Sequence, residues 1–188
     1  MTRGGVLGVG AVAGVAVLLA WLLFVGLPRW YGGPAKASAA PAAAQVPSGR
    51  KIKARLFYVS DEGTRLTSVE RDVAYGEGTA EQAKEIVNAQ TAPVAQPLLS
   101  AVPPGTKLRA LFVTEGHAYV DLSREVAVAH PGGALDELLT IYTIVNALTI
   151  NLPAVSAVQV LVDGKEVDTL AGHVDLRRPL AKNLAWVE

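Results

Sequence analysis

The chain has 188 residues, no cysteine and no formal net charge, with 17 basic and 17 acidic side chains. The lack of cysteine excludes disulfides, thiolate catalysis, Cys-ligated zinc and a lipidated cysteine. Arg3, Arg29 and Lys36 are the only charged residues before residue 50, so all 17 acidic and 14 of the 17 basic side chains lie in residues 50–188. This evenly mixed region argues against nucleic-acid binding, which needs a basic surface.

An apolar run of 22 residues, 6–27, contains no charged or strongly polar side chain. As a helix it would be about 33 Å long, which matches a hydrocarbon core of about 30 Å. The run is followed by Pro28, Arg29, Trp30 and Tyr31, a helix stop with side chains typical of a membrane interface. We therefore expect a short tail at residues 1–5 and a transmembrane helix at 6–27 that binds the lipid bilayer.

A cleaved signal peptide is the alternative reading of this segment, because Ala35-Lys36-Ala37 and Ala37-Ser38-Ala39 have the form of a cleavage site. The apolar run is longer than the core of a signal peptide, about 7–15 residues, and both sites lie well beyond its end. An uncleaved helix is therefore favoured. Charge leaves the orientation nearly undecided, because basic residues flank both ends of the run.

Residues 28–49 are rich in small residues, and 15 of the 18 residues from Gly32 to Gly49 are Ala, Pro, Gly or Ser. A segment of this composition cannot bury enough apolar surface to offset the entropy lost on ordering. We predict a linker at 28–49 and one folded domain at 50–188.

The first half of this domain has the pattern of a hairpin followed by a helix. Residues 51–59 alternate basic and apolar side chains before becoming wholly apolar, and Asp61-Glu62-Gly63 is a turn signal before a more polar strand at 65–73. Thr79 and Gln82 form a capping box that predicts a helix starting at Thr79 and stopping before Pro93. Its apolar side contains Ala83, Ile86, Val87 and Gln90.

The second half begins after a proline-rich connection at 93–105. Residues 107–113 and 117–122 flank the turn residues Glu115-Gly116 and predict a second hairpin. Alternation places Leu108, Ala110 and Phe112 on one face of the first strand, and Ala118, Val120 and Leu122 on one face of the second. A helix is expected next, from apolar spacings of three and four at Leu135, Leu138, Leu139, Tyr142, Val145 and Leu148, and it ends at Asn151-Leu152-Pro153.

The last segment predicts strands only. Residues 157–162 are nearly all apolar, as expected at the centre of a sheet, and Asp163-Gly164 is a two-residue turn into a strand at 166–170. A final strand is expected at 173–180. The order ββαββαββ favours an α+β two-layer sandwich, with two helices on one face of an antiparallel or mixed sheet, preceded by one transmembrane helix.

The residues that could support chemistry are scattered. His117, His130 and His173 are far apart and lack the spacing of metal ligands, so we interpret them as surface or turn residues. Asp121 and Ser123 follow His117, but Ser123 lacks the glycine context of a nucleophile elbow.

Glycines and acidic pairs complete the search for a site. Gly76-Glu77-Gly78 lacks the third glycine of a dinucleotide loop and is interpreted as the lead-in to a helix. The pairs Asp61-Glu62 and Asp136-Glu137 are assigned to a turn and to the polar side of a helix. We predict no catalytic, cofactor-binding or metal-binding residue.

Four blocks of the chain resemble the GerMN family of sporulation and spore germination domains. The blocks are LFYVSDEGTRL, VERDVAYGEGTAEQAKEIVNAQTAP, PPGTKLRALFVTEGHAYVDLS and LPAVSAVQVLVDGKEVDTLAGHVDLRRPL, and they cover most of residues 52–180. The resemblance implies a non-enzymatic extracytoplasmic domain, similar to the ring-building modules of envelope assemblies. Spore formers carry a tandem pair on a lipoprotein that helps to assemble a channel, whereas this chain has one copy and no cysteine.

These observations lead to a functional hypothesis and an alternative. The leading hypothesis is a single-pass protein of the cytoplasmic membrane, with its N-terminus inside and its domain outside, that contacts envelope proteins or associates with itself. The alternative is a domain that binds or remodels peptidoglycan. An enzyme is the third possibility, and His117 and Asp121 are the only pair of residues that the sequence offers for catalysis. The N-inside orientation rests on the family resemblance.

Overall fold

The computed structural model describes residues 49–188. The predicted tail, the predicted transmembrane helix at 6–27 and nearly all of the predicted linker at 28–49 lie outside the described residues. Residues 49–188 belong to one compact unit. The elements follow in the order β1 (Lys51–Val59), β2 (Leu66–Ala74), α3 (Gly78–Thr91), β3 (Leu108–Thr114), β4 (His117–Leu122), α4 (Glu125–Val128), α5 (Ala134–Asn151), β5 (Ala157–Val162), β6 (Lys165–Glu166) and β7 (Leu180–Ala181).

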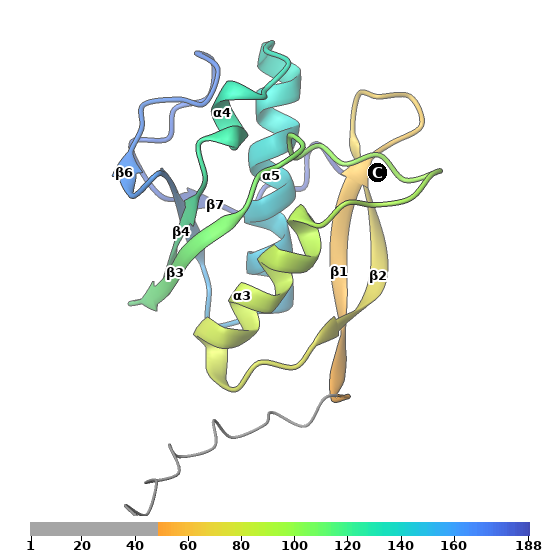
Figure 1. Ribbon diagram of the computed structural model, residues 1–188, viewed down its shortest axis with the longest axis vertical. Helices are drawn as coiled ribbons and strands as arrows, with labels where there is room; N and C mark the ends of the chain where they lie inside the picture. Colours follow the sequence, from red (N-terminus) through yellow and green to blue (C-terminus); the bar gives the residue numbers. More distant parts are fainter. Residues whose placement is uncertain (1–48) are drawn as a thin grey trace, which may run out of the picture. The chain divides into compact units, whose positions relative to one another are not determined.

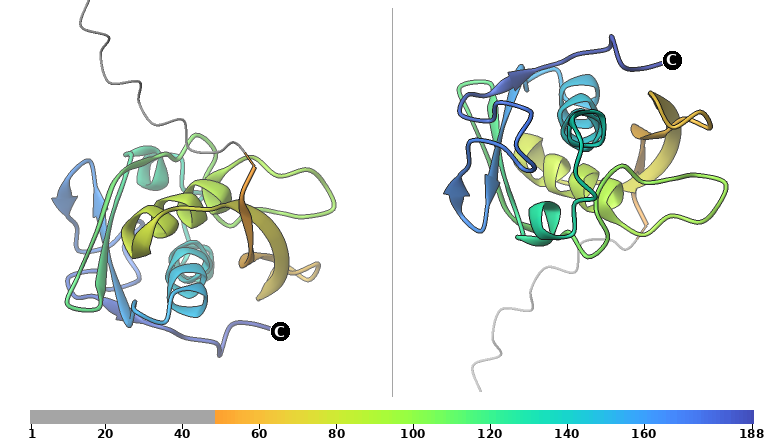
Figure 2. Two further views of the ribbon diagram at one scale, coloured as in Figure 1. Left: turned by 90° about the horizontal axis from the view of Figure 1, so that it is seen from below. Right: turned by 90° about the horizontal axis from the view of Figure 1, so that it is seen from above.

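The two long helices lie between two separate sheets. One sheet is the antiparallel β1–β2 hairpin, and the other has the strand order β3-β4-β5-β6 with β7 also paired to β5. Figure 1 labels these elements, and Figure 2 shows α3 and α5 in the middle with the hairpin on one side and the larger sheet on the other. The fold is therefore α+β with three layers.

This arrangement contradicts the predicted fold class. The prediction of one sheet with two helices on a single face is wrong, because the first hairpin does not join the second sheet. A third, short helix, α4, was not expected. Among residues 49–188, none of the helices combines the length and the apolar character needed to cross a membrane.

The burial of α5 explains the third layer. The predicted apolar stripe includes Leu139, Val145 and Leu148, which are buried, but Thr140, Ile144 and Ala147 on the opposite side of the helix are buried as well. A helix with one sheet packed on each side must bury opposite sides. The sequence pattern was interpreted as one broad stripe, and the second buried side was missed.

The larger sheet is mixed, with β5 at its centre as predicted. Strands β3 and β4 form the expected hairpin around Glu115-Gly116, β5 is parallel to β4, and β6 and β7 pair with the other edge of β5. The predicted strands at 166–170 and 173–180 are mostly irregular instead, and only the two-residue strands β6 and β7 form.

A β-bulge in β3 overturns the predicted face of that strand. The register with β4 shifts between Leu108 and Ala110, so an extra residue enters at Arg109. Leu111 is buried as a result, whereas Phe112 is 58% exposed. Leu108, Ala110 and Phe112 therefore do not form one core face. The predicted face of β4 is confirmed, since Ala118, Val120 and Leu122 are all buried.

Helix α3 begins at Gly78 without the predicted capping box. Glu77 is the N-cap residue, and no side chain caps this end. Gln82 instead binds the preceding segment, because its Oε1 accepts from the amide of Gly76 at 3.0 Å and its Nε2 donates to the carbonyl of Ala74 at 3.0 Å. A side chain at Gly76 would clash with the backbone of Glu81, so this close approach requires glycine.

Two side-chain amides close the edge of β1 that faces the helices. Gln90 on α3 accepts from the amide of Phe57 at 2.9 Å and donates to its carbonyl at 2.7 Å. Asn151 at the end of α5 makes the same pair of bonds to Arg55, at 2.9 and 2.8 Å. Each amide takes the place of a peptide group in a neighbouring strand, and the hairpin is thereby fixed to both helices.

We expect Gln90→Leu to lower the free energy of unfolding by about 2–4 kcal/mol, because it leaves the buried amide and carbonyl of Phe57 unpaired. Chemical denaturation measures the change. Asn88→Leu is the matched control, since Asn88 is an exposed amide on the same helix; its effect should stay within about 0.5 kcal/mol. Equal effects of the two substitutions would contradict the role given to Gln90.

Candidate interaction surface and polar clusters

The carboxylate of Glu137 is fully buried at the start of α5 and binds the segment between β6 and β7. Its Oε1 accepts from the amide of Leu170 at 2.7 Å, and its Oε2 accepts from the amide of His173 at 2.8 Å. The Nδ1 atom of His173 lies 3.1 Å from the same Oε2. The prediction that Glu137 lies on the polar side of a helix is therefore wrong, and His173 is a partner of this carboxylate. Asp136 beside it is exposed, as predicted.

The surroundings of Glu137 determine its charge. Burial by itself raises the pKa of this carboxyl, but backbone amides of Ala171, His173, Leu170 and Val174 lower it, and the net pKa lies below its ordinary value. The carboxylate is thus charged at neutral pH and is held by main-chain donors. One signal in the sequence could have revealed it, because Glu137 lies on the same side of α5 as the buried Ile141 and Ile144.

A second polar cluster forms where β4 meets the turn after β5. Asp121 is buried, and its Oδ1 accepts from the amide of Gly164 at 2.7 Å. Arg109 places its Nη1 3.5 Å from Asp121 Oδ2 and 3.3 Å from Asp163 Oδ1. This turn needs positive φ at Asp163 and Gly164, so the cluster holds a strained connection.

His130 connects three segments of the chain. Its Nδ1 accepts from the amide of Gly132 at 3.0 Å, so its Nε2 carries the proton toward Thr140 Oγ1 at 3.2 Å. Thr140 in turn donates to the carbonyl of Ala101 at 2.6 Å. His130, which was expected to be a surface or turn residue, is half-buried between α4 and α5, and its ring joins α5 to the proline-rich connection.

The structure does not bring His117, Asp121 and Ser123 together as a catalytic set. Asp121 binds the turn after β5, and Ser123 Oγ accepts from the amide of Lys107 at 3.0 Å. Within residues 49–188, no three His, Cys, Asp or Glu side chains are placed to hold a metal ion. Asp61 and Glu62 are exposed in the turn between β1 and β2, as predicted.

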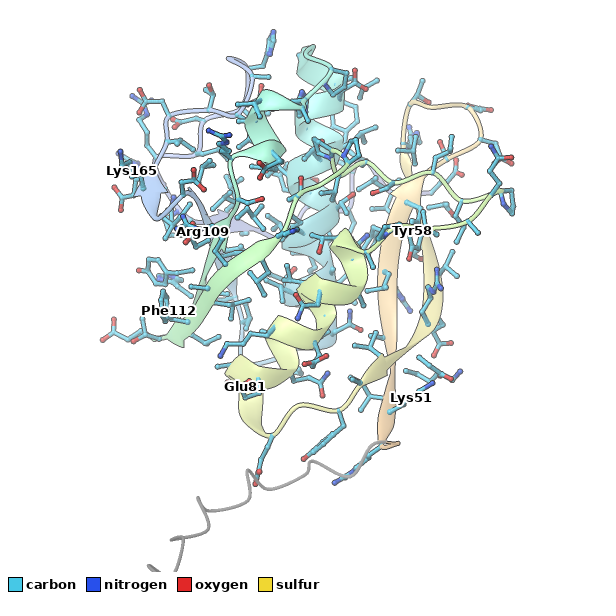
Figure 3. All side chains as sticks on the ribbon, viewed as in Figure 1. Lys51, Tyr58, Glu81, Arg109, Phe112 and Lys165 are labelled. Carbon is cyan, nitrogen blue, oxygen red and sulfur yellow. The ribbon has the colours of Figure 1, made fainter. Side chains whose placement is uncertain are left out.

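The outer face of the β3–β4 hairpin carries an exposed aromatic side chain. Phe112 is 58% exposed and is paired across the hairpin with Tyr119, which is half-buried. Figure 3 shows Phe112 extending from β3 away from the helices. An exposed phenylalanine beside a tyrosine on an open sheet face is typical of a contact surface. We call this pair, Phe112 and Tyr119, the aromatic patch.

A shallow cleft of about 310 Å³ lies between the proline-rich connection and the start of α5. It is lined mainly by apolar side chains, including Val102, Pro103 and Leu139, and Asp136 is the ionisable residue in its lining. Catalysis by acid and base requires converging ionisable groups, so this lining does not resemble an active site.

The family comparison decides what kind of domain this is. The family model described as "Germane: Sporulation and spore germination" matches residues 55–168, which is more than half of the chain. The chain belongs to this family. No curated protein matches it. The predicted resemblance to GerMN domains is confirmed.

Solved structures share the fold of this GerMN domain at low identity. The first GerMN domain of the sporulation protein GerM from Bacillus subtilis is 14% identical, with a TM-score of 0.53, and the match covers 70% of this chain and 98% of that one. The tandem GerMN domains of the same protein are 17% identical, with a TM-score of 0.55, and the match covers 71% of this chain and 46% of that one. The chain thus spans about half of the tandem structure.

A candidate lipoprotein from Clostridium perfringens has the same fold. It is 23% identical, with a TM-score of 0.52, and the match covers 70% of this chain and 88% of that one. At these identities the three structures establish the fold alone.

We expect Glu137→Gln to destabilise this GerMN domain by about 2–4 kcal/mol at pH 7, because an amide cannot accept as many main-chain bonds as the buried carboxylate. The folded pKa is depressed, so the stabilisation is present above the unfolded value near 4.5 and is lost as pH falls through the lower folded pKa. Urea denaturation from pH 3 to 7 should show the two proteins converging at low pH.

The neighbouring Asp136→Asn is the control for this experiment. Asp136 is exposed in the first turn of α5, so its loss should cost about 0.3–1 kcal/mol. A constant difference between wild type and Glu137→Gln across the pH range would contradict the account of Glu137.

Proposed function

We propose that this protein is a non-enzymatic interaction module of the bacterial cell envelope, with its GerMN domain outside the cytoplasm. The observation that supports it most is the contrast between its polar groups and its surface. The buried ionisable side chains Glu137 and Asp121 bind main-chain amides, whereas the aromatic patch is presented to solvent.

The polar clusters support a structural role because each has a partner within the fold. Glu137 holds the segment before β7, Asp121 holds the turn after β5, and His130 holds the start of α5. A general base or a nucleophile would need a side chain that is directed into a cleft and is accessible to a substrate. Glu137, Asp121 and His130 are instead hydrogen-bonded to main-chain groups of the fold.

The relatives support the location. The tandem and single GerMN domains come from a sporulation protein, and the Clostridium perfringens neighbour is a candidate lipoprotein, which is a class of protein attached at the outer side of a membrane. We carry this location over to the present chain as part of the proposal.

The location can be tested with single cysteines, because the natural chain has none. Glu62→Cys lies in the exposed turn between β1 and β2, and we expect a membrane-impermeant maleimide to label it in intact protoplasts. Ala83→Cys is buried on α3 and should react only after denaturation. Labelling of Glu62→Cys only after the protoplasts are lysed would place the domain inside and refute the proposal.

The interaction role can be tested at the aromatic patch. A photoreactive phenylalanine analogue at position 112 of the full-length chain should cross-link to envelope proteins in living cells of the native host, because this side chain is 58% exposed. The same analogue at Glu62 is the matched control. If position 112 yields no adduct, or no more than position 62, the aromatic patch is not a contact surface.

A further inference from the structure

Most strand edges in this fold are closed within the described residues. Arg55 and Phe57 of β1 are bonded to Asn151 and Gln90, and Val59 is bonded to the carbonyl of Leu99 at 2.8 Å. The second edge of β5 is occupied by β6 and β7. An unpaired edge can join a strand from another chain, and proteins usually close such edges.

The edge of β2 is protected in a different way. Leu66 donates to the carbonyl of Trp186 at 2.7 Å, and Glu188 donates to the carbonyl of Leu66 at 2.9 Å. The exposed part of the strand carries three successive charges, Glu70, Arg71 and Asp72. Charged side chains on an edge strand discourage pairing with another chain.

Strand β3 has neither form of protection. It is the terminal strand of its sheet, and within residues 49–188 nothing outside β4 bonds to the main chain of Leu111 or Val113. Since Thr114 and His117 close a two-residue turn, the amide and carbonyl of Leu111 and Val113 point to the open edge. The strand contains no proline, and Arg109 is its one charged residue.

Within residues 49–188, the space beside the start of β3 is open. A groove of about 450 Å³ lies between the end of α3 and the start of β3, and its lining includes Asn88, Thr91 and Leu108. Figure 1 draws β3 in the foreground with no element in front of it. An additional strand would continue the sheet from this side.

We infer that β3 pairs antiparallel with β3 of a second copy of this chain, on a two-fold axis through Phe112. In this register Leu111 of each copy exchanges main-chain hydrogen bonds with Val113 of the other, which gives about four bonds. Phe112 stands directly opposite Phe112 of the second copy. A two-fold axis makes such a contact self-complementary.

The side chains also favour a second copy of this chain as the partner of β3. The aromatic patch of each copy would join that of the other, so that Tyr119, Phe112, Phe112 and Tyr119 form one row across the new sheet. The two charged residues from 108 to 115 are Arg109 and Glu115, which have opposite signs, and the register places each opposite the other. No pair of like charges faces across the contact.

This inference rests on the proposed function, because it names the partner that the aromatic patch contacts. The test uses cysteines in the full-length chain, kept in solution with mild detergent. Phe112→Cys should form a disulfide-linked dimer on mild oxidation, because directly opposed residues that are not hydrogen-bonded have Cα atoms about 4.5 Å apart, within the range for a disulfide.

Two matched variants control the test. Thr114→Cys lies on the same strand but faces Ala110 of the second copy, so it should cross-link far less. Val128→Cys is 72% exposed on α4 and should show only random collision. We expect at least about tenfold more dimer from Phe112→Cys than from either control on a non-reducing gel.

Sedimentation velocity gives a second readout without cysteines. The wild-type chain should show a dimer that increases with concentration, and Phe112→Lys should abolish it, whereas Val128→Lys should not. Circular dichroism should show that each variant is folded.

The outcomes separate the two proposals. If Phe112→Cys forms no more dimer than the controls while position 112 still cross-links to another envelope protein, the second copy is ruled out and the interaction role stands. If position 112 contacts nothing, both proposals fail. A dimer that survives Phe112→Lys would also overturn pairing through β3.

Discussion

Helix α5 is buried between two sheets, and the rest of the domain is attached to its polar side chains. Glu137 binds the segment before β7, Thr140 binds the proline-rich connection, and Asn151 binds β1. Asn146 donates to the carbonyl of Asn183 at 2.8 Å and accepts from its amide at 3.0 Å. A buried helix of this kind stabilises irregular segments because its side chains supply the hydrogen bonds that strands would otherwise make.

This arrangement explains why polar residues that seem suited to catalysis are not available for it. Glu137, Thr140 and Asn146 of α5 bind main-chain groups that have no strand partner. Leaving such groups unpaired would cost about 1–3 kcal/mol each. Glu137 and Thr140 are therefore required by the fold itself. Surface residues such as Phe112, which make no such bond, are free to contact a partner.

Local patterns predicted the elements that depend on local sequence. Both hairpins, helices α3 and α5 and the central strand β5 follow from alternation, helical spacing and turn residues. The layers could not be predicted in this way, because two buried sides of α5 look like one broad apolar stripe. The role of Glu137 depends on amides 33 and 36 residues away, at Leu170 and His173. The bulge at Arg109 places Leu111 on the buried face of β3 and Phe112 on the exposed face, and no turn residue in the sequence marks this bulge.

The two sheets also differ in how their edges are treated, and this difference links the fold to its proposed role. Closing β1 requires two side-chain amides, the buried Gln90 and the half-buried Asn151, and each must be placed accurately because a misplaced amide would leave polar groups unsatisfied. The chain thus uses specific residues of α3 and α5 to prevent pairing at one edge. Within residues 49–188, no side chain bonds to the main chain of Leu111 or Val113 at the open edge of β3. An open edge beside an exposed aromatic side chain fits the proposed pairing with β3 of a second copy.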